Sequence, residues 1–266
     1  MITVNNLFDP RHLPRKNSRT CRVASLDVEW TKNYRIKNGN RAFCFSLAVL
    51  DVPTTDPVAD LAQLSFGYVS MYVEDAGETG ELVVSAADTI ARTFADADLI
   101  TGHQLCSDLA VLVANRENAE PALDSARAAW STRRTPKDEG PRIIDTRYDA
   151  GHLLDGTSRR LVDVCTELGL DVTQPELRST SMTSLHRRWL EKNDIEARER
   201  VSVLNLRHSL STALVAVSAA GLGGWGEVGL NVNRMIAAHA EGWGWLQSRT
   251  FQDLLGEPCQ SASARS

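Results

Sequence analysis

The sequence predicts an α/β fold, with a mixed β-sheet of three antiparallel and two parallel strands flanked by helices and a helical C-terminal region. Three apolar runs separated by turn-rich segments come first, a pattern typical of an antiparallel meander. Segments with helical spacing then alternate with two further short apolar runs, which indicates strands joined through helices. From residue 158 onward the spacing of apolar residues predicts only helices.

The first three strands are expected at residues 21–30, 42–52 and 63–75. The first of them is apolar until it reaches Asp27 and Glu29, a pattern that favours a buried strand with a functional site at its end. The sequence Asn38-Gly39-Asn40 then supplies turn chemistry before the second strand. We therefore expect these three strands to be antiparallel neighbours.

The later elements follow from the change of period. Leu82, Ala86, Ile90 and Phe94 recur at helical spacing and predict a helix through residue 95. Short apolar runs at 99–101 and within 142–150 predict two more strands, each followed by a helix. Residues 117–141 are charged and contain prolines, so we expect a surface excursion there.

Four regions are expected along the chain. They are an irregular N-terminal arm (1–20), the α/β domain itself (21–220), a helical extension (221–255) and a disordered tail (256–266). The Gly-rich stretch 221–226 fits the letters of a dinucleotide-binding fingerprint, but we expect a long helix before it instead of the strand that such a site needs. We expect Trp225, Trp243 and Trp245 to pack this region onto the domain, and not to stack on unpaired bases.

The bulk composition limits the possible functions. The chain has 266 residues and a formal net charge of −5, so it lacks the overall basic character of a simple nucleic-acid-binding module. That argument is weaker for a metal-dependent nuclease, whose acidic site binds cations. Five widely spaced cysteines favour reduced thiols, and no apolar leader or membrane-spanning stretch is evident. We expect a cytoplasmic protein with no membrane partner.

The first candidate site is the pair Asp27 and Glu29. Side chains two residues apart on a strand point to the same face, so the two carboxylates should lie side by side. Adjacent carboxylates repel each other, and a cation between them relieves this repulsion. Hard oxygen ligands of this kind suit Mg²⁺ or Mn²⁺. The alternative is an outward-facing acidic pair on an edge strand.

The second candidate is Asp108, at the start of the helix that follows the fourth strand. The segment from Ile100 to Leu109 resembles the second motif of the DEDD (DnaQ-like) 3′–5′ exonucleases, which have a ribonuclease-H-like fold. The matching positions are Gly102, His103, Leu105, Asp108 and Leu109. Gln104 stands where that family usually has Asn. Without the resemblance, Asp108 could equally be an acid that complements the helix dipole.

The third motif of this family's histidine branch matches only in part. His208 is in the place of the family's general base, whereas the position of its fourth metal-binding aspartate falls on Ala213. The resemblance implies a two-metal phosphodiester hydrolysis in which Asp27, Glu29 and Asp108 hold Mg²⁺ or Mn²⁺ and His208 accepts a proton from water. It also implies that Asp145, between the motifs, is structural. Without the resemblance, His208 would be interpreted as a packed helix histidine.

The missing acid leaves three outcomes open. Another acid, Asp194, Glu196 or Glu227, could take its place in space. The site could also work with fewer ligands and a weaker affinity for metal. The third outcome is a domain that has lost catalysis and still binds nucleic acid.

We therefore expect a metal-dependent 3′–5′ exonuclease that acts on DNA or RNA 3′ ends, in single-stranded form. The first alternative is a non-catalytic module of the same fold that binds nucleic acid or a protein partner. The second is a metal-dependent phosphoesterase acting on nucleotides or other small phosphates, for which the acidic net charge leaves room.

Overall fold

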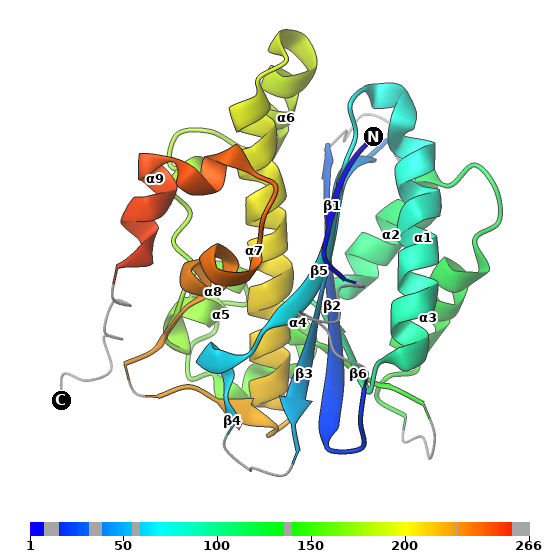
Figure 1. Cartoon of the computed structure of the whole chain (residues 1–266). Coiled ribbons are helices and arrows are strands. Elements are labelled where there is room, and N and C mark those ends of the chain that lie inside the picture. The colour runs from blue at the N-terminus through cyan, green and yellow to red at the C-terminus, as the bar shows by residue number, and fades with distance from the viewer. Residues whose placement is uncertain (8–15, 32–38, 55–58, 136–139, 227, 257–266) are drawn as a thin grey trace.

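A central sheet separates two layers of helices in the computed structural model of the chain (Figure 1). The structure describes residues 1–7, 16–31, 39–54, 59–135, 140–226 and 228–256. Helices α1, α2 and α3 cover one face of the sheet, and the long helix α7 crosses the other face. The predicted α/β class, with a mixed sheet flanked by helices, is confirmed.

The sheet has six strands in the order β1-β5-β3-β2-β6-β7. Their bounds are β1 Ile2–Asn5, β2 Thr20–Thr31, β3 Arg41–Pro53, β5 Phe66–Tyr72, β6 Leu99–Gly102 and β7 Arg142–Asp145. β5, β3 and β2 are antiparallel neighbours, and β6 and β7 extend the sheet in parallel from β2. This arrangement confirms the predicted three antiparallel strands and two parallel ones.

Apart from α3, the helices follow the predicted order. Their bounds are α1 Thr79–Asp96, α2 Leu105–Asn115, α3 Pro121–Ser131, α4 Thr146–Asp149, α5 Leu161–Glu167, α6 Met182–Lys192, α7 Ile195–Ala219, α8 Val232–His239 and α9 Arg249–Gln252. The longest, α7, is buried on nearly all sides, because the sheet lies against one side of it and later parts of the chain cover the other. Among the described residues, no helix combines the length and apolarity that crossing a membrane requires.

Alternation along β2 decides which of its side chains meet α7. Leu26 and Val28 are buried in the apolar cluster that also contains Leu82 of α1 and Leu109 of α2. Val23 belongs to the second cluster, which lies on the α7 side. Since neighbouring side chains on a strand point to opposite faces, the odd-numbered positions of β2 face α7. Asp27 and Glu29 are odd positions farther along the same strand.

Three predictions about elements were wrong. The N-terminal arm is not irregular throughout, because Ile2–Asn5 forms β1 and pairs with β5 at the edge of the sheet. The expected surface excursion contains α3, which buries Leu123 and Ala126. The region after residue 158 also contains short strands, which are β8 Leu170–Asp171, β9 Gly223–Gly224 and β10 Leu230–Asn231. β9 pairs with a two-residue strand, β4 Ala59–Asp60.

The C-terminal region packs against the domain. Trp243 and Trp245 are 5% and 2% exposed, which confirms that these tryptophans pack and do not form an open stacking surface. The ring of Trp243 stacks on Tyr68 of β5 at 5.6 Å between centroids. The Gly-rich stretch directly follows α7, so the context of a dinucleotide-binding fingerprint is absent at this point of the described chain. Residues 257–266 of the expected disordered tail lie outside the described residues.

Candidate metal centre

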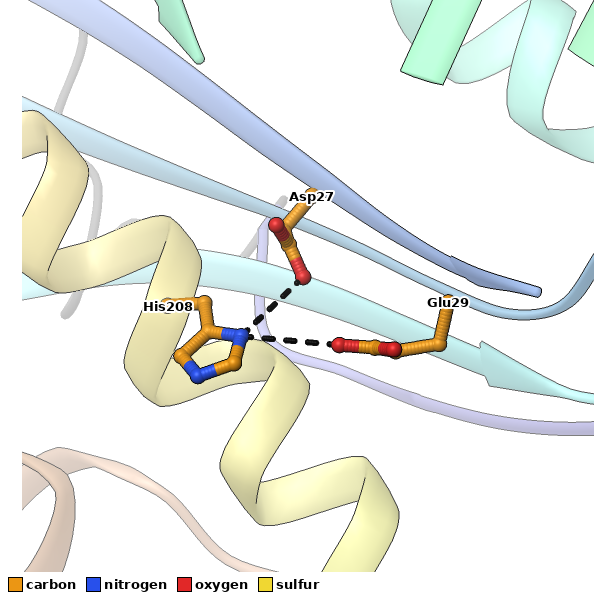
Figure 2. Close-up of side chains that lie close together, drawn as sticks. All are labelled: Asp27, Glu29 and His208. Carbon is orange, nitrogen blue, oxygen red and sulfur yellow. Dashed lines mark ion pairs between the residues drawn. The ribbon is translucent and has the colours of Figure 1, made fainter. Parts of the chain in front are cut away.

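Asp27 and Glu29 extend from β2 toward His208 of α7, as Figure 2 shows. The imidazole Nδ1 of His208 lies 3.5 Å from Oδ2 of Asp27 and 3.5 Å from Oε1 of Glu29. One ligand atom from each of these three residues lies within 4.8 Å of the other two. The structure thus brings together three of the four site residues predicted from the sequence.

The three side chains are partly accessible to solvent. Asp27, Glu29 and His208 have side-chain exposures of 14%, 19% and 18%. This degree of burial weakens screening by water and leaves room for an incoming ligand. The alternative of an outward-facing acidic pair on an edge strand is wrong, because β2 lies inside the sheet between β3 and β6.

Two amide side chains fix the orientation of this centre. Asn205 lies one helical turn before His208, is fully buried, and donates from Nδ2 to Oδ2 of Asp27 at 2.6 Å. The side-chain amide of Gln174 lies 2.9 Å from Nε2 of His208. Sequence analysis missed both residues. The spacing of Asn205 and His208 on one helix face was a usable signal, whereas Gln174 lies in a distant loop that gives none.

The two carboxylates control the charge of the histidine. Burial by itself would lower the pKa of His208, but contact with Asp27 and Glu29 outweighs burial and raises the pKa to about 10. Without a metal, an imidazolium therefore balances part of the negative charge of the pair. A divalent cation between the carboxylates would compete directly with this proton.

Asp108 lies near the centre but is not one of the three residues whose ligand atoms lie within 4.8 Å of one another. The register pairs Ser25 of β2 with Thr101 of β6, so the turn that precedes α2 and Asp108 lies beside Asp27. Asp108 is 3% exposed, and its Oδ2 has no hydrogen-bond partner among the described residues. Burial raises the pKa of Asp108 well above its usual range, and the charges of Asp27 and Glu29 raise it further.

The turn around Gly102 explains the other residues of the second motif. His103 is held by contacts to Thr146 Oγ1 at 3.0 Å and to the carbonyl of Arg159 at 2.9 Å. Gln104 has a left-handed backbone with φ of 68°, and its N–H donates to Asp145 at 2.9 Å. Asn adopts this conformation more readily than Gln, which gives a physical reason for Asn at this position.

Asp145 is structural, as expected. It is fully buried, and its Oδ2 accepts a hydrogen bond from the indole N–H of Trp130 at 2.9 Å. Its Oδ1 accepts from the N–H of Arg147, so the same side chain caps α4. These contacts satisfy the carboxylate inside the fold and leave it no role at the centre.

The position expected for the fourth acid is part of the apolar core. Ala213 is fully buried in the apolar cluster on the α7 side of the sheet. Two acids considered as substitutes are engaged elsewhere, because Asp194 caps α7 and binds Arg188, and Glu196 pairs with Arg200. Glu227, the third, lies outside the described residues.

The donors present fit a divalent cation. Two carboxylates and one imidazole converge, and a buried carboxyl oxygen without a partner lies close enough to feel their charge. Carboxylate and imidazole are both common ligands of divalent metals in proteins. The residues that would hold the cation are Asp27 and Glu29, with Asp108 near them.

A separate pocket of about 1100 Å³ lies toward the end of β2 and beside α6. It does not include Asp27, Glu29, Asp108 or His208. Arginine and glutamate side chains both line it, so its charge favours no single class of ligand. The chemical centre is therefore the cluster on β2 and α7 and not this larger hollow.

No protein-family model and no curated protein matches the chain. The assignment of a function therefore depends on the geometry and chemistry of the residues described above.

Proposed function

We propose that the protein is a metal-dependent phosphodiester hydrolase that removes nucleotides from the 3′ ends of DNA or RNA, with single strands as its substrate. The observation that carries this proposal is the convergence of Asp27, Glu29 and His208 on one point. The partial match to the DEDD exonuclease motifs selects nucleic acid over other phosphate esters. The mixed sheet agrees with the fold that this resemblance implies.

The chain's own residues have separate tasks in this proposal. Asp27 and Glu29 would hold Mg²⁺ or Mn²⁺, which would supply positive charge beside the phosphate that reacts. Asn205 keeps the Asp27 carboxylate turned toward α7 through its hydrogen bond. The turn of His103 and Gln104, fixed to Thr146 and Asp145, sets the start of α2 and hence the place of Asp108.

The test is digestion of 3′-labelled and 5′-labelled single-stranded DNA and RNA with Mn²⁺, with Mg²⁺ and with EDTA. We expect stepwise shortening from the 3′ end that needs the metal and is lost in Asp27→Asn. Asp88→Asn is the matched control, because Asp88 is an exposed acid on α1 far along the chain from the centre. Equal cleavage by wild type and Asp27→Asn would refute the proposal, as would no cleavage by the folded, metal-loaded wild type.

A non-catalytic module of the same fold is the second candidate. Ala213 favours it, since this position contributes a methyl group to the core where the resembling enzymes have an acid. In that case labelled single strands would bind without being shortened under any metal condition. Cleavage of small phosphate esters in preference to strands would instead indicate the phosphoesterase.

A further inference from the structure

We propose that His208 is itself a ligand of the cation through Nδ1, and that the centre therefore binds a transition-metal cation such as Mn²⁺ or Co²⁺ more tightly than Mg²⁺. This inference rests on the proposed metal centre and assigns to His208 a role different from the general base that the resemblance implies. It describes a centre with two carboxylates and one imidazole, which accounts for the acid missing at Ala213.

The first argument is the position of Nδ1. It is 3.5 Å from one oxygen of Asp27 and 3.5 Å from one oxygen of Glu29. Adjacent ligands of an octahedral cation with bonds of about 2.1 Å lie about 3 Å apart. Nδ1 is therefore nearly as far from each carboxylate oxygen as neighbouring ligands on one cation are from each other.

The second argument is the contact at the other imidazole nitrogen. Nε2 of His208 lies 2.9 Å from the amide nitrogen of Gln174, and rotating that amide by half a turn puts its oxygen in this place as the acceptor of Nε2–H. A metal-binding histidine usually donates its second nitrogen to such an acceptor, which fixes the ring and its tautomer. With Nδ1 beside the carboxylates and Nε2 beside Gln174, both nitrogens contact side chains.

The third argument is the anchoring of Gln174. Two residues later, Glu176 forms a fully buried ion pair with Arg207, the residue just before His208 on α7. The distances are 3.0 Å from Nη2 to Oε1 and 3.4 Å from Nη1 to Oε2. The loop that carries Gln174 is therefore held against the same turn of α7 that carries the imidazole.

The kind of cation follows from the donors. Mg²⁺ prefers oxygen ligands and retains water, whereas the affinity of a site with nitrogen and oxygen ligands rises along the transition metals from Mn²⁺ to Co²⁺ and beyond. The competing interpretation is that His208 only forms ion pairs with the carboxylates and leaves the centre when a cation binds. The two interpretations differ in whether an imidazole N–H is close to the bound metal.

The experiment is a Co²⁺ titration of the full chain, followed by visible absorption and by proton NMR. We expect a strongly shifted, solvent-exchangeable N–H signal from the Nε2–H of His208 in the wild type. His208→Gln should lack this signal and bind Co²⁺ at least about tenfold more weakly. His152→Gln is the matched control, because His152 is exposed and outside the centre. Circular dichroism verifies that each variant is folded.

The outcomes separate this inference from the proposed function. If Co²⁺ binds the wild type and His208→Gln equally, without the shifted signal, the ligand role is refuted while the metal-dependent nuclease stands. If the signal is present and strands are not cleaved, the ligand role stands and the nuclease proposal fails. Failure of the wild type to bind Co²⁺, or equal affinity for Mg²⁺ and Mn²⁺, would contradict the inference directly.

Discussion

Two buried carboxyl groups illustrate how surroundings decide the role of the same residue type. Asp145 receives hydrogen bonds from Gln104, Trp130 and Arg147. Asp108 is equally buried, but its Oδ2 has no partner among the described residues. A buried polar atom without a partner destabilises a fold unless a ligand satisfies it. The first group therefore stabilises the fold, whereas the second would gain a partner only from a cation at the proposed centre.

This difference predicts opposite effects of the same substitution. Asp108→Asn should leave the metal-free protein as stable as the wild type or more stable at pH 7, because it removes an acid whose ionised form is unfavourable there. Asp145→Asn should lower the free energy of unfolding by about 1–3 kcal/mol, because its new N–H groups face donors. Urea denaturation at pH 7 with EDTA measures both. A large loss of stability in Asp108→Asn would contradict the account of its environment.

Two histidines predict a loss of stability in acid. Burial lowers the pKa of His103 and of His186 from 6.5 to about 4, so both stay neutral in the folded protein while the unfolded chain takes up protons below pH 6.5. Each should lower the free energy of unfolding by up to about 1.4 kcal/mol per pH unit between pH 6.5 and 4. Above pH 6.5 both histidines should be neutral in the folded and the unfolded chain, so they should not change how the free energy of unfolding depends on pH.

Urea denaturation across this range is the measurement, and His186→Asn is the informative variant. The asparagine can still accept from the hydroxyl of Tyr72, which lies 3.0 Å from Nδ1 of His186. It loses the stacking on Phe43, so its stability at pH 7 should be lower. Its dependence on pH below 6.5 should nevertheless be shallower than that of the wild type. If the free energy of unfolding of His186→Asn depended on pH as steeply as that of the wild type, His186 would not be a source of the loss of stability in acid.

At the scale of elements, α7 connects the core to the centre. His208 and Asn205 lie on the side that faces β2, while Arg207 points into a buried ion pair with Glu176. Removing one partner of a buried pair leaves a charge without compensation. The helix therefore depends on the loop that precedes α6, because Glu176 of that loop compensates the buried charge of Arg207.

We expect Glu176→Gln to lower the free energy of unfolding by about 3–5 kcal/mol. The double variant Arg207→Met with Glu176→Leu should recover most of that loss, because apolar pairs of similar size often replace buried ion pairs without cost. The test is to measure the free energy of unfolding of the wild type, Glu176→Gln and the double variant by urea denaturation. If the double variant were as unstable as Glu176→Gln, this prediction would be wrong.

Helices and strands with a clear local sequence pattern were predicted, and those without one were missed. The strand carrying Asp27 and Glu29 and helix α1 have clear periods, and both were predicted within a few residues. Helix α3 was missed because it buries few residues and its exposed face is charged. Strand β1 was missed because only four residues form it and its pairing partner β5 is distant in the sequence. The contact of Gln174 with His208 depends on tertiary packing and has no local signal.

At the scale of the whole molecule, the metal should stabilise the fold. A ligand that binds only the folded state at a hundred times its Kd adds about 2.7 kcal/mol. For a domain of this size, such a gain raises Tm by roughly 5–10 °C. Thermal unfolding with Mn²⁺ and with EDTA measures the shift, which should disappear in Asp27→Asn. A shift of equal size in that variant would place the bound metal elsewhere.

The contact between Tyr68 and the C-terminal region has a consequence for how the chain is made. The hydroxyl of Tyr68 donates to the carbonyl of Glu241 and accepts from its N–H, both at 3.0 Å, and Trp243 covers its ring. A ribosome synthesises Tyr68 about 170 residues before these partners, so a nascent chain carries an uncovered apolar face on β5 through most of translation. The protein should therefore complete its core late in synthesis, and chaperones that shield exposed apolar strands should increase its yield.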